Sequence, residues 1–252
     1  MKKTIAALSV LVFSIPLAFA EVLVINDQQY VGDDGFFHIV GEVKNDTGAP
    51  INQIILEATL YDLEDNIIAI KHTDSLVNTI MPGMKGPFDL IIGSPEVEKI
   101  YSYVITASYK IGAPKNQAID IVSSELLRDS HNNLMITGMV TNRGEITANI
   151  VSVVATLYDR DGSVAAVSRV HPEPDYLRSN GEAFFLVPVP DKTQTMEIDD
   201  YLLVAESEEY AAVPEFSIGM SVLLAGSVSA YVGISRYSSH VIANLVSATN
   251  PK

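Results

Sequence analysis

The residues best suited to ligand chemistry are acidic side chains in two short turns. Asp159 and Asp161 flank Arg160 and precede Gly162. Carboxylates at alternate positions before a glycine resemble the start of a calcium-binding loop. The bidentate glutamate that completes an EF-hand is missing, so Asp159 and Asp161 are only weak metal candidates. The alternative is a hairpin turn with solvated carboxylates, which the related turn after Asp62 also fits.

Other chemical signatures are sparse. The histidines lie far apart in the sequence, without the spacing of a metal site: His38, His72, His131, His171 and His240. Nucleophile-elbow, P-loop, zinc-protease and dinucleotide-binding motifs are missing from the sequence. We therefore expect neither enzymatic activity nor a cofactor. Asn45-Asp46-Thr47 is a sequon, which makes Asn45 a candidate glycan acceptor on a turn expected to be exposed.

The composition of the chain excludes some classes of partner and some kinds of site. The chain has 252 residues and a net charge of −15. Nucleic acid is therefore not an expected partner. The sequence has no cysteine, so disulfides, thiolate chemistry and cysteine-ligated zinc are excluded. The folded parts must be held together by packing alone.

The elements that position these residues belong to an internal repeat. The sequence ATLYD occupies residues 58–62 and again residues 155–159, so the two copies lie 155 − 58 = 97 residues apart. The same offset of 97 residues pairs Gly41 with Gly138, Asn45 with Asn142 and Phe88 with Phe185. A repeat of this length is a whole small domain. We expect a first module at residues 21–112 and a second at 113–210, with residues 112–117 as a short linker that restricts the angle between them.

Hydrophobic residues alternate with a period of two in both copies, which predicts strands. Ala58 and Leu60, like Ala155 and Leu157, should face a core, while Tyr61 and Tyr158 should face the other way. Gly41 and Gly138 fall within strands, where each marks a bulge or the close packing of another backbone or a ring. Several short strands per module predict an all-β fold of two tandem immunoglobulin-like antiparallel β-sandwiches.

Both ends of the chain carry targeting features. Residues 1–20 combine Lys2 and Lys3 with an apolar run and end at Ala20, as a cleaved secretory signal peptide does. A second uncharged segment begins at Phe216 and ends at Ser235. It is long enough to cross a bilayer as one helix. Residues 211–214 should separate the second module from this transmembrane or sorting segment (211–236), and residues 237–252 should form a short tail.

The modules resemble the FxLYD domain of secreted prokaryotic proteins. The likeness is carried by Leu60-Tyr61-Asp62 and Leu157-Tyr158-Asp159 together with the preceding Gly41 and Asn45, or Gly138 and Asn142. It implies an extracellular immunoglobulin-like module without a known catalytic centre. The sequence from Val213 to Phe216, the apolar segment and Arg236 resemble archaeal PEFG-type sorting tails, although Ser217 replaces a glycine and sixteen residues follow Arg236. Together these resemblances imply an archaeal cell-surface protein.

Two classes of function remain open from the sequence. The first is a non-enzymatic cell-surface protein, anchored in the cytoplasmic membrane, that presents both modules outside for structural or binding interactions with envelope proteins or glycans. The second is a ligand- or metal-binding accessory subunit of a membrane complex. The acidic residues Asp199, Asp200 and Glu206 to Glu209 are specific to the second module, but they lack a partnering base.

Overall fold

The computed structural model describes residues 21–93, 97–131, 133–189 and 198–214. Within these residues the protein is all-β, with several antiparallel sheets and a single short 3-10 helix, η1 (Val97–Lys99). β-branched and aromatic residues fill alternating positions of the strands, which suits a pleated surface with a buried face. The all-β class expected from the periodicity is therefore confirmed.

The first module consists of two sheets. Their strands are β1 (Val22–Val31), β2 (Phe37–Asn45), β3 (Ile51–Tyr61), β4 (Ile67–Asp74), β5 (Thr79–Ile80), β6 (Lys85–Ile92) and β7 (Ser102–Ile111). One sheet has the order β1-β2-β6, and in the other β3 lies between β4 and β7 and also pairs with β5.

The second module repeats this plan. Its strands are β8 (Ile119–Arg128), β9 (Leu134–Asn142), β10 (Ser152–Asp159), β11 (Val164–Val170), β12 (Glu182–Val189), β13 (Ile198–Glu206) and β14 (Val213–Pro214). One sheet has the order β12-β9-β8 and the other β11-β10-β13-β14. The strands β8, β9 and β12 begin and end 97 residues after β1, β2 and β6. The structural repeat thus follows the sequence repeat.

Each module has its own core between its two sheets. Ala58 and Leu60 are fully buried in the first core, and Ala155 and Leu157 are fully buried in the second. Their neighbours point to the opposite faces of β3 and β10 because side chains alternate along a strand. The phase predicted for the repeated ATLYD strand is therefore confirmed.

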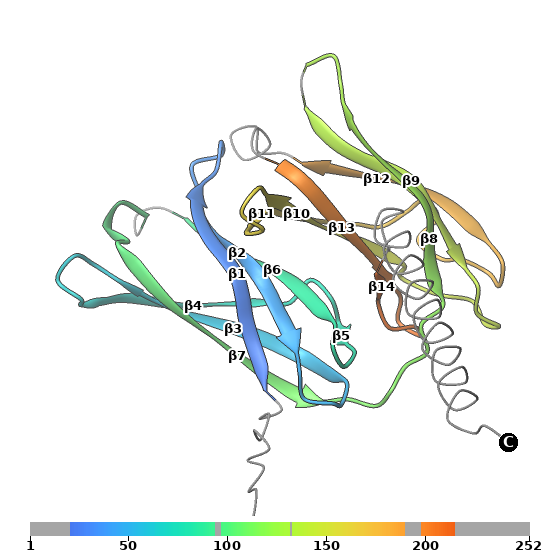
Figure 1. Ribbon diagram of the computed structural model, residues 1–252, viewed down its shortest axis with the longest axis horizontal. Helices are drawn as coiled ribbons and strands as arrows, with labels where there is room; N and C mark the ends of the chain where they lie inside the picture. The colour runs from blue at the N-terminus through green and yellow to red at the C-terminus, as the bar shows by residue number, and fades with distance from the viewer. Residues whose placement is uncertain (1–20, 94–96, 132, 190–197, 215–252) are drawn as a thin grey trace, which may run out of the picture.

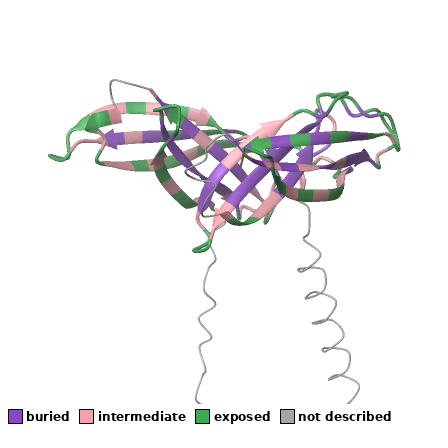
Figure 2. Ribbon diagram, turned by 90° about the horizontal axis from the view of Figure 1, so that it is seen from above, coloured by how far each residue is buried: buried purple, intermediate pink, exposed green. Residues whose placement is uncertain are grey.

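The two modules share a buried interface. Strand β2 is buried on both faces, because its outward residues His38, Val40 and Glu42 are covered by the second module, whose β11 lies against β1, β2 and β6. Outward residues of β10 and β13, including Val154 and Val204, belong to the same apolar cluster as the first core. The sheets follow one another as four layers, with buried residues running through the centre (Figures 1 and 2).

Residues 211–214 are not the plain linker that the sequence suggested. Ala211 and Ala212 are fully buried, and β14 pairs with β13. The Ala211 N–H donates to the Asn116 carbonyl, and the Gln117 amide donates to the Ala212 carbonyl at 2.6 Å. These bonds tie both ends of the second module together, so the ordered domain extends past residue 210.

No helix in the described part of the chain combines the length and apolarity needed to cross a membrane. The predicted signal peptide (1–20), the apolar segment (216–235) and the tail (237–252) all lie outside the described residues.

Candidate functional site

The weak metal candidates organise a hairpin turn. Asp159 Oδ1 accepts hydrogen bonds from the backbone N–H groups of Asp161 and Ser163, both at 2.9 Å. Asp62 does the same in the first module, and its pKa is lowered chiefly by the hydrogen bond from the Asn66 backbone. The final aspartate of each Leu-Tyr-Asp motif therefore closes the turn between two strands. Over the residues that the structure covers, no three acidic or histidine side chains are grouped to hold a metal ion.

The paired asparagines are buried structural residues. Asn45 Nδ2 donates to the carbonyls of Ala49 and Ile80, each at 2.8 Å. Asn142 Nδ2 makes the corresponding bonds to Ile146 and Leu177. The expected exposure of the sequon turn is therefore wrong for Asn45, which is 0% exposed. A glycan on the folded module would replace one Nδ2 hydrogen and so remove one of these two hydrogen bonds, and the sugar would need space beside a fully buried side chain, so the geometry weighs against attachment at this site.

The paired glycines make room for aromatic rings. A Cβ at Gly41 would lie 2.7 Å from the Phe88 ring, and one at Gly138 would lie 2.5 Å from the Phe185 ring. Each phenylalanine faces its glycine across a ladder of paired strands. Both kinds of role predicted for these glycines are observed. Each glycine packs against a ring, and each lies opposite or beside a register shift in the neighbouring strand, between Ile25 and Gln28 in β1 and between Ile121 and Ser123 in β8.

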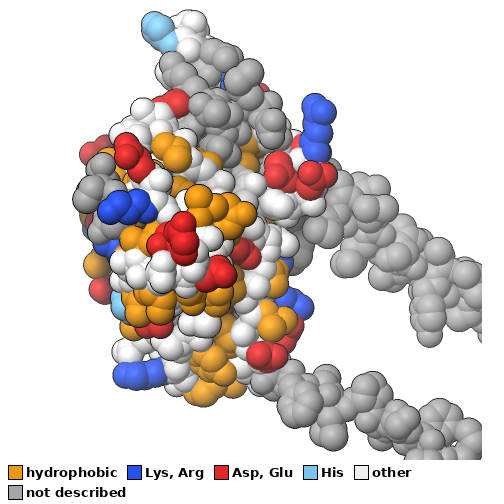
Figure 3. Space-filling model, turned by 90° about the vertical axis from the view of Figure 1, so that its left-hand side faces the viewer, with side chains coloured by type: hydrophobic (Ala, Val, Ile, Leu, Met, Phe, Trp, Pro, Cys, Tyr) orange, Lys and Arg blue, Asp and Glu red, His pale blue; other side chains and the backbone are white. Residues whose placement is uncertain are grey.

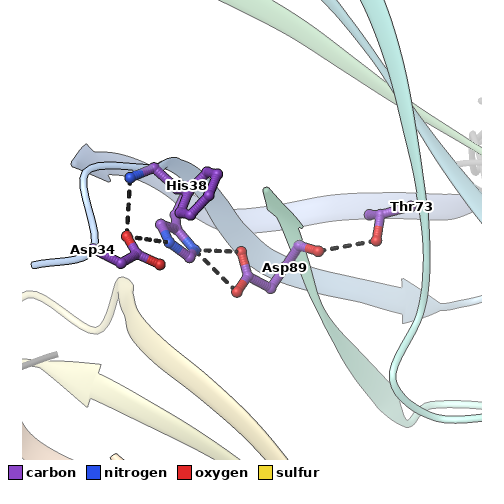
Figure 4. Close-up of polar contacts among 5 residues, drawn as sticks. Asp34, His38, Thr73 and Asp89 are labelled. Carbon is purple, nitrogen blue, oxygen red and sulfur yellow. Dashed lines mark hydrogen bonds and ion pairs between the residues drawn. The ribbon is translucent and has the colours of Figure 1, made fainter. Parts of the chain in front are cut away.

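A histidine and two aspartates form a polar cluster at one end of the first module (Figure 4). His38 Nδ1 lies 3.0 and 3.1 Å from the two carboxylate oxygens of Asp89, and its Nε2 lies 3.8 Å from Asp34. The His38 ring stacks on Tyr30 with a centroid distance of 4.9 Å. Thr73 Oγ1 donates to the Asp89 carbonyl, which links β4 to β6 across the two sheets.

This cluster favours ion pairing over catalysis. Burial raises the pKa of Asp89, although the neighbouring His38 opposes that rise. A histidine oriented by a carboxylate resembles the base half of a catalytic triad, but both of its ring nitrogens face carboxylates. In the second module Met135 and Leu186 replace His38 and Asp89. The cluster is therefore specific to the first module.

A second charged centre lies where the modules meet. Glu42 is 0% exposed and receives hydrogen bonds from three donors: Lys85 Nζ at 2.9 Å, Asn26 Nδ2 at 3.0 Å and the Tyr158 hydroxyl at 2.6 Å. Burial and then the Glu42 charge raise the pKa of the Tyr158 phenol. The buried carboxylate is thus satisfied only when Tyr158 of the second module is in place.

Glu206 forms a third charged centre at the same interface. Its two carboxylate oxygens each lie 3.0 Å from the backbone nitrogen of Asn78, in the loop between β4 and β5. Burial raises the pKa of Glu206 to about 7, and the Asn78 hydrogen bond, Arg169 and Lys115 oppose the rise. Glu206 therefore connects β13 of the second module to a loop of the first.

Sequence reasoning missed Glu42, Tyr158 and Glu206 as interface residues. Tyr158 was expected only to face away from the core, and Glu206 was assigned to an acidic run. For Glu42, a comparison of the two copies at outward strand positions contains the missing signal, because Glu42 corresponds to Met139 and its partner Lys85 to Glu182. Tyr158 carries no such signal, because Tyr61 occupies the same position in the first copy.

Comparisons with known proteins identify a domain model but no activity. A family model described as "Protein of unknown function (DUF3426)" matches residues 116–200, which span most of the second module. No curated protein matches the chain. Similar solved structures include an exo-chitosanase of Amycolatopsis orientalis, with 10% identity over 79% of this chain and 27% of that chain and a TM-score of 0.30.

They also include the transglutaminase of red sea bream, with 10% identity over 77% of this chain and 30% of that chain and a TM-score of 0.24. The chain thus spans less than a third of the length of either protein. Similarity at this level says nothing about activity.

Proposed function

We propose that this chain is a non-enzymatic, membrane-anchored cell-surface protein whose two immunoglobulin-like, FxLYD-like modules provide a rigid scaffold for interactions in the cell envelope. One observation carries the proposal: the buried carboxylates of Glu42 and Glu206 and the partly buried carboxylate of Asp89 all join strands, loops or modules to one another. Charges used in this way stabilise an arrangement of domains and are not available to substrates.

The location follows from the sequence features at the two ends. A signal peptide at residues 1–20 would direct the modules across the cytoplasmic membrane, and the uncharged segment at 216–235 would hold them there with the sandwiches outside. The resemblance to PEFG-type tails makes a sorting segment the alternative to a plain membrane anchor at this position. Partners in this setting are envelope proteins or glycans.

An accessory subunit that binds a ligand or metal within a membrane complex is the second candidate. The observation in its favour is the exposed edge of the His38 cluster, which has no counterpart in the second module: the Asp34 carboxylate is 54% exposed there and accessible to a polar ligand, although, among the residues that the structure describes, the cluster is not grouped to hold a metal ion. A protein that serves only as a spacer would not require such a difference.

Cross-linking mass spectrometry on native membranes separates the two candidates. A scaffold should cross-link to surface-layer proteins or to other copies of itself, whereas an accessory subunit should cross-link reproducibly to one integral membrane complex and co-purify with it. Protease treatment of intact cells should remove the modules in either case. Full protection of the modules in intact cells, with digestion only after lysis, would refute the surface location.

A further inference from the structure

The interface between the modules joins two different faces of the repeated fold. The first module contributes the outward face of β1-β2-β6, and the second contributes the outward face of β10-β11-β13. Such a head-to-tail contact is heterologous, because it joins two different faces. Each module has both kinds of face but uses only one of them in this contact, so one face on each module remains unused. The unused faces are the outward face of β3-β4-β7 on the first module and that of β8-β9-β12 on the second.

The unused face of the second module is apolar. Phe184 is 53% exposed and Leu186 is 44% exposed on β12, where they pair with Met139 and Thr137 of β9. Leu127 is 37% exposed on β8 and pairs with Met135. A sheet face that borders only water normally carries polar residues at these positions.

The unused face of the first module is apolar as well. Ile70, Thr59 and Val104 pair in a row across β4, β3 and β7, and Ile70 and Val104 are 51% and 56% exposed. Ile55, on the same face of β3, is 41% exposed. Hydrophobic side chains gather among acidic ones at this end of the molecule (Figure 3). Exposed apolar patches of this kind mark interaction sites.

Comparison of the two copies points to what covers these faces. Positions that are charged on the first module's buried face become apolar on the second module's unused face: Glu42 corresponds to Met139 and Asp89 to Leu186. Ser152, buried at the interface, corresponds to the exposed Ile55. At these three positions the unused faces are more apolar than the faces that already pack together, whereas the buried Val40 and Val154 correspond to Thr137 and Glu57.

We propose that the β3-β4-β7 face of one chain docks on the β8-β9-β12 face of a second copy, which continues the stack of sheets head to tail. The occupant is another copy of this chain, because the chain already contains the same contact between corresponding faces. Glu57 and His72 lie on the docking surface but contact each other at 2.9 Å, so each has a polar partner on its own chain when the face is covered.

The internal contact predicts which residues meet between chains. The Tyr158 hydroxyl reaches Glu42 within one chain, so Tyr61 of one copy should lie beside Met139 of the next. The protein has no cysteine. Full-length chains carrying Tyr61→Cys and Met139→Cys can therefore be mixed and treated with a short bismaleimide. We expect several-fold more mixed dimer than with Leu63→Cys, at an exposed hairpin tip, mixed with Met139→Cys.

Leu186→Asp provides the second test. It introduces the residue that the first module carries at Asp89, at a position that is already partly exposed, so the module should keep its melting temperature. The added charge should abolish the mixed cross-link, because desolvating an unpaired carboxylate is costly.

Three results would overturn the proposal. One is that Met139→Cys chains cross-link only to each other, which indicates a symmetric contact. Another is that Met139→Cys is protected from labelling at high dilution, which indicates that a segment of the same chain covers the face. The third is a mixed cross-link that persists in Leu186→Asp. None of these results depends on where the protein is located, so they leave the surface proposal untouched.

Discussion

Glu206→Gln should remove most of the pH dependence of stability between about pH 5 and about pH 8. Glu206 is 1% exposed and receives the Asn78 N–H at the interface between the modules. Its burial raises the pKa from 4.5 to about 7. In the unfolded chain the same carboxyl ionises near its ordinary value. The folded protein therefore binds a proton more tightly than the unfolded protein does.

The sign and size of the effect follow from this difference. The stabilisation from the protonated group is fully present below the unfolded pKa of 4.5 and is lost as the pH rises through about 7. At about 1.4 kcal/mol for each pKa unit, the free energy of unfolding should fall by roughly 2 to 3 kcal/mol over this window. Asp89 contributes in the same direction, since burial raises its pKa too. In Glu206→Gln only the contribution of Glu206 to this pH dependence should vanish, and the contribution of Asp89 should remain.

Urea unfolding followed by far-ultraviolet circular dichroism measures the change, since the chain has no tryptophan. Glu208→Gln is the matched control, because it removes the same charge from an exposed side chain two residues away. We expect the control to keep the wild-type pH dependence. If Glu206→Gln and Glu208→Gln lose the same amount of stability between about pH 5 and about pH 8, the assigned burial of Glu206 is wrong.

Three further predictions concern the interface, the core and the sequon. Tyr158→Phe leaves one oxygen of the buried Glu42 carboxylate without a donor and should lower the free energy of unfolding by about 1 to 3 kcal/mol. Tyr61→Phe, at the corresponding position of the first module, should change it by less than about 0.5 kcal/mol. Equal effects of the two variants in urea unfolding would contradict the interface. Gly138→Ala brings a methyl group against the Ser123 carbonyl oxygen and within 2.5 Å of the Phe185 ring, and it should destabilise the chain by about 1 to 3 kcal/mol. An unchanged melting temperature would show that both the backbone of β8 and the ring can move aside. Asn45 should carry no glycan in the folded protein, so glycosidase treatment should leave the intact mass unchanged; a loss of mass at this residue would show that the amide is accessible before folding is complete.

Duplication followed by divergence accounts for the distribution of residues between the copies. The asparagine amides, the glycine-phenylalanine contacts and the turn aspartates recur with the same partners in both modules, since each sandwich needs them to close. Many outward positions of the strands have changed instead, although Thr59 and Tyr61 recur as Thr156 and Tyr158. An outward position that contacts the other module in one copy corresponds, in the other copy, to a position that lies exposed at an end of the stack.

The sequence alone predicted the elements whose information is local or repeated. Alternation placed Ala58 and Leu60 in a core, because a strand exposes its two faces in turn. The offset of 97 residues aligned β1, β2 and β6 with β8, β9 and β12. The hairpin turns after Asp62 and Asp159 were also predictable, because an aspartate can bond the backbone a few residues ahead of it.

Tertiary structure alone decided how the modules meet. Alternation shows that Glu42 and Tyr158 point away from their own cores, but it does not reveal that the two outward faces pack against each other. That contact depends on the relative placement of residues 116 positions apart, and it turns an apparently exposed glutamate into a buried ion. It also buries Glu206 beside the Asn78 N–H, and this burial raises the pKa of the Glu206 carboxyl to about 7. Burial is a property of the assembled sheets, and a strand's own sequence specifies only which of its faces is apolar.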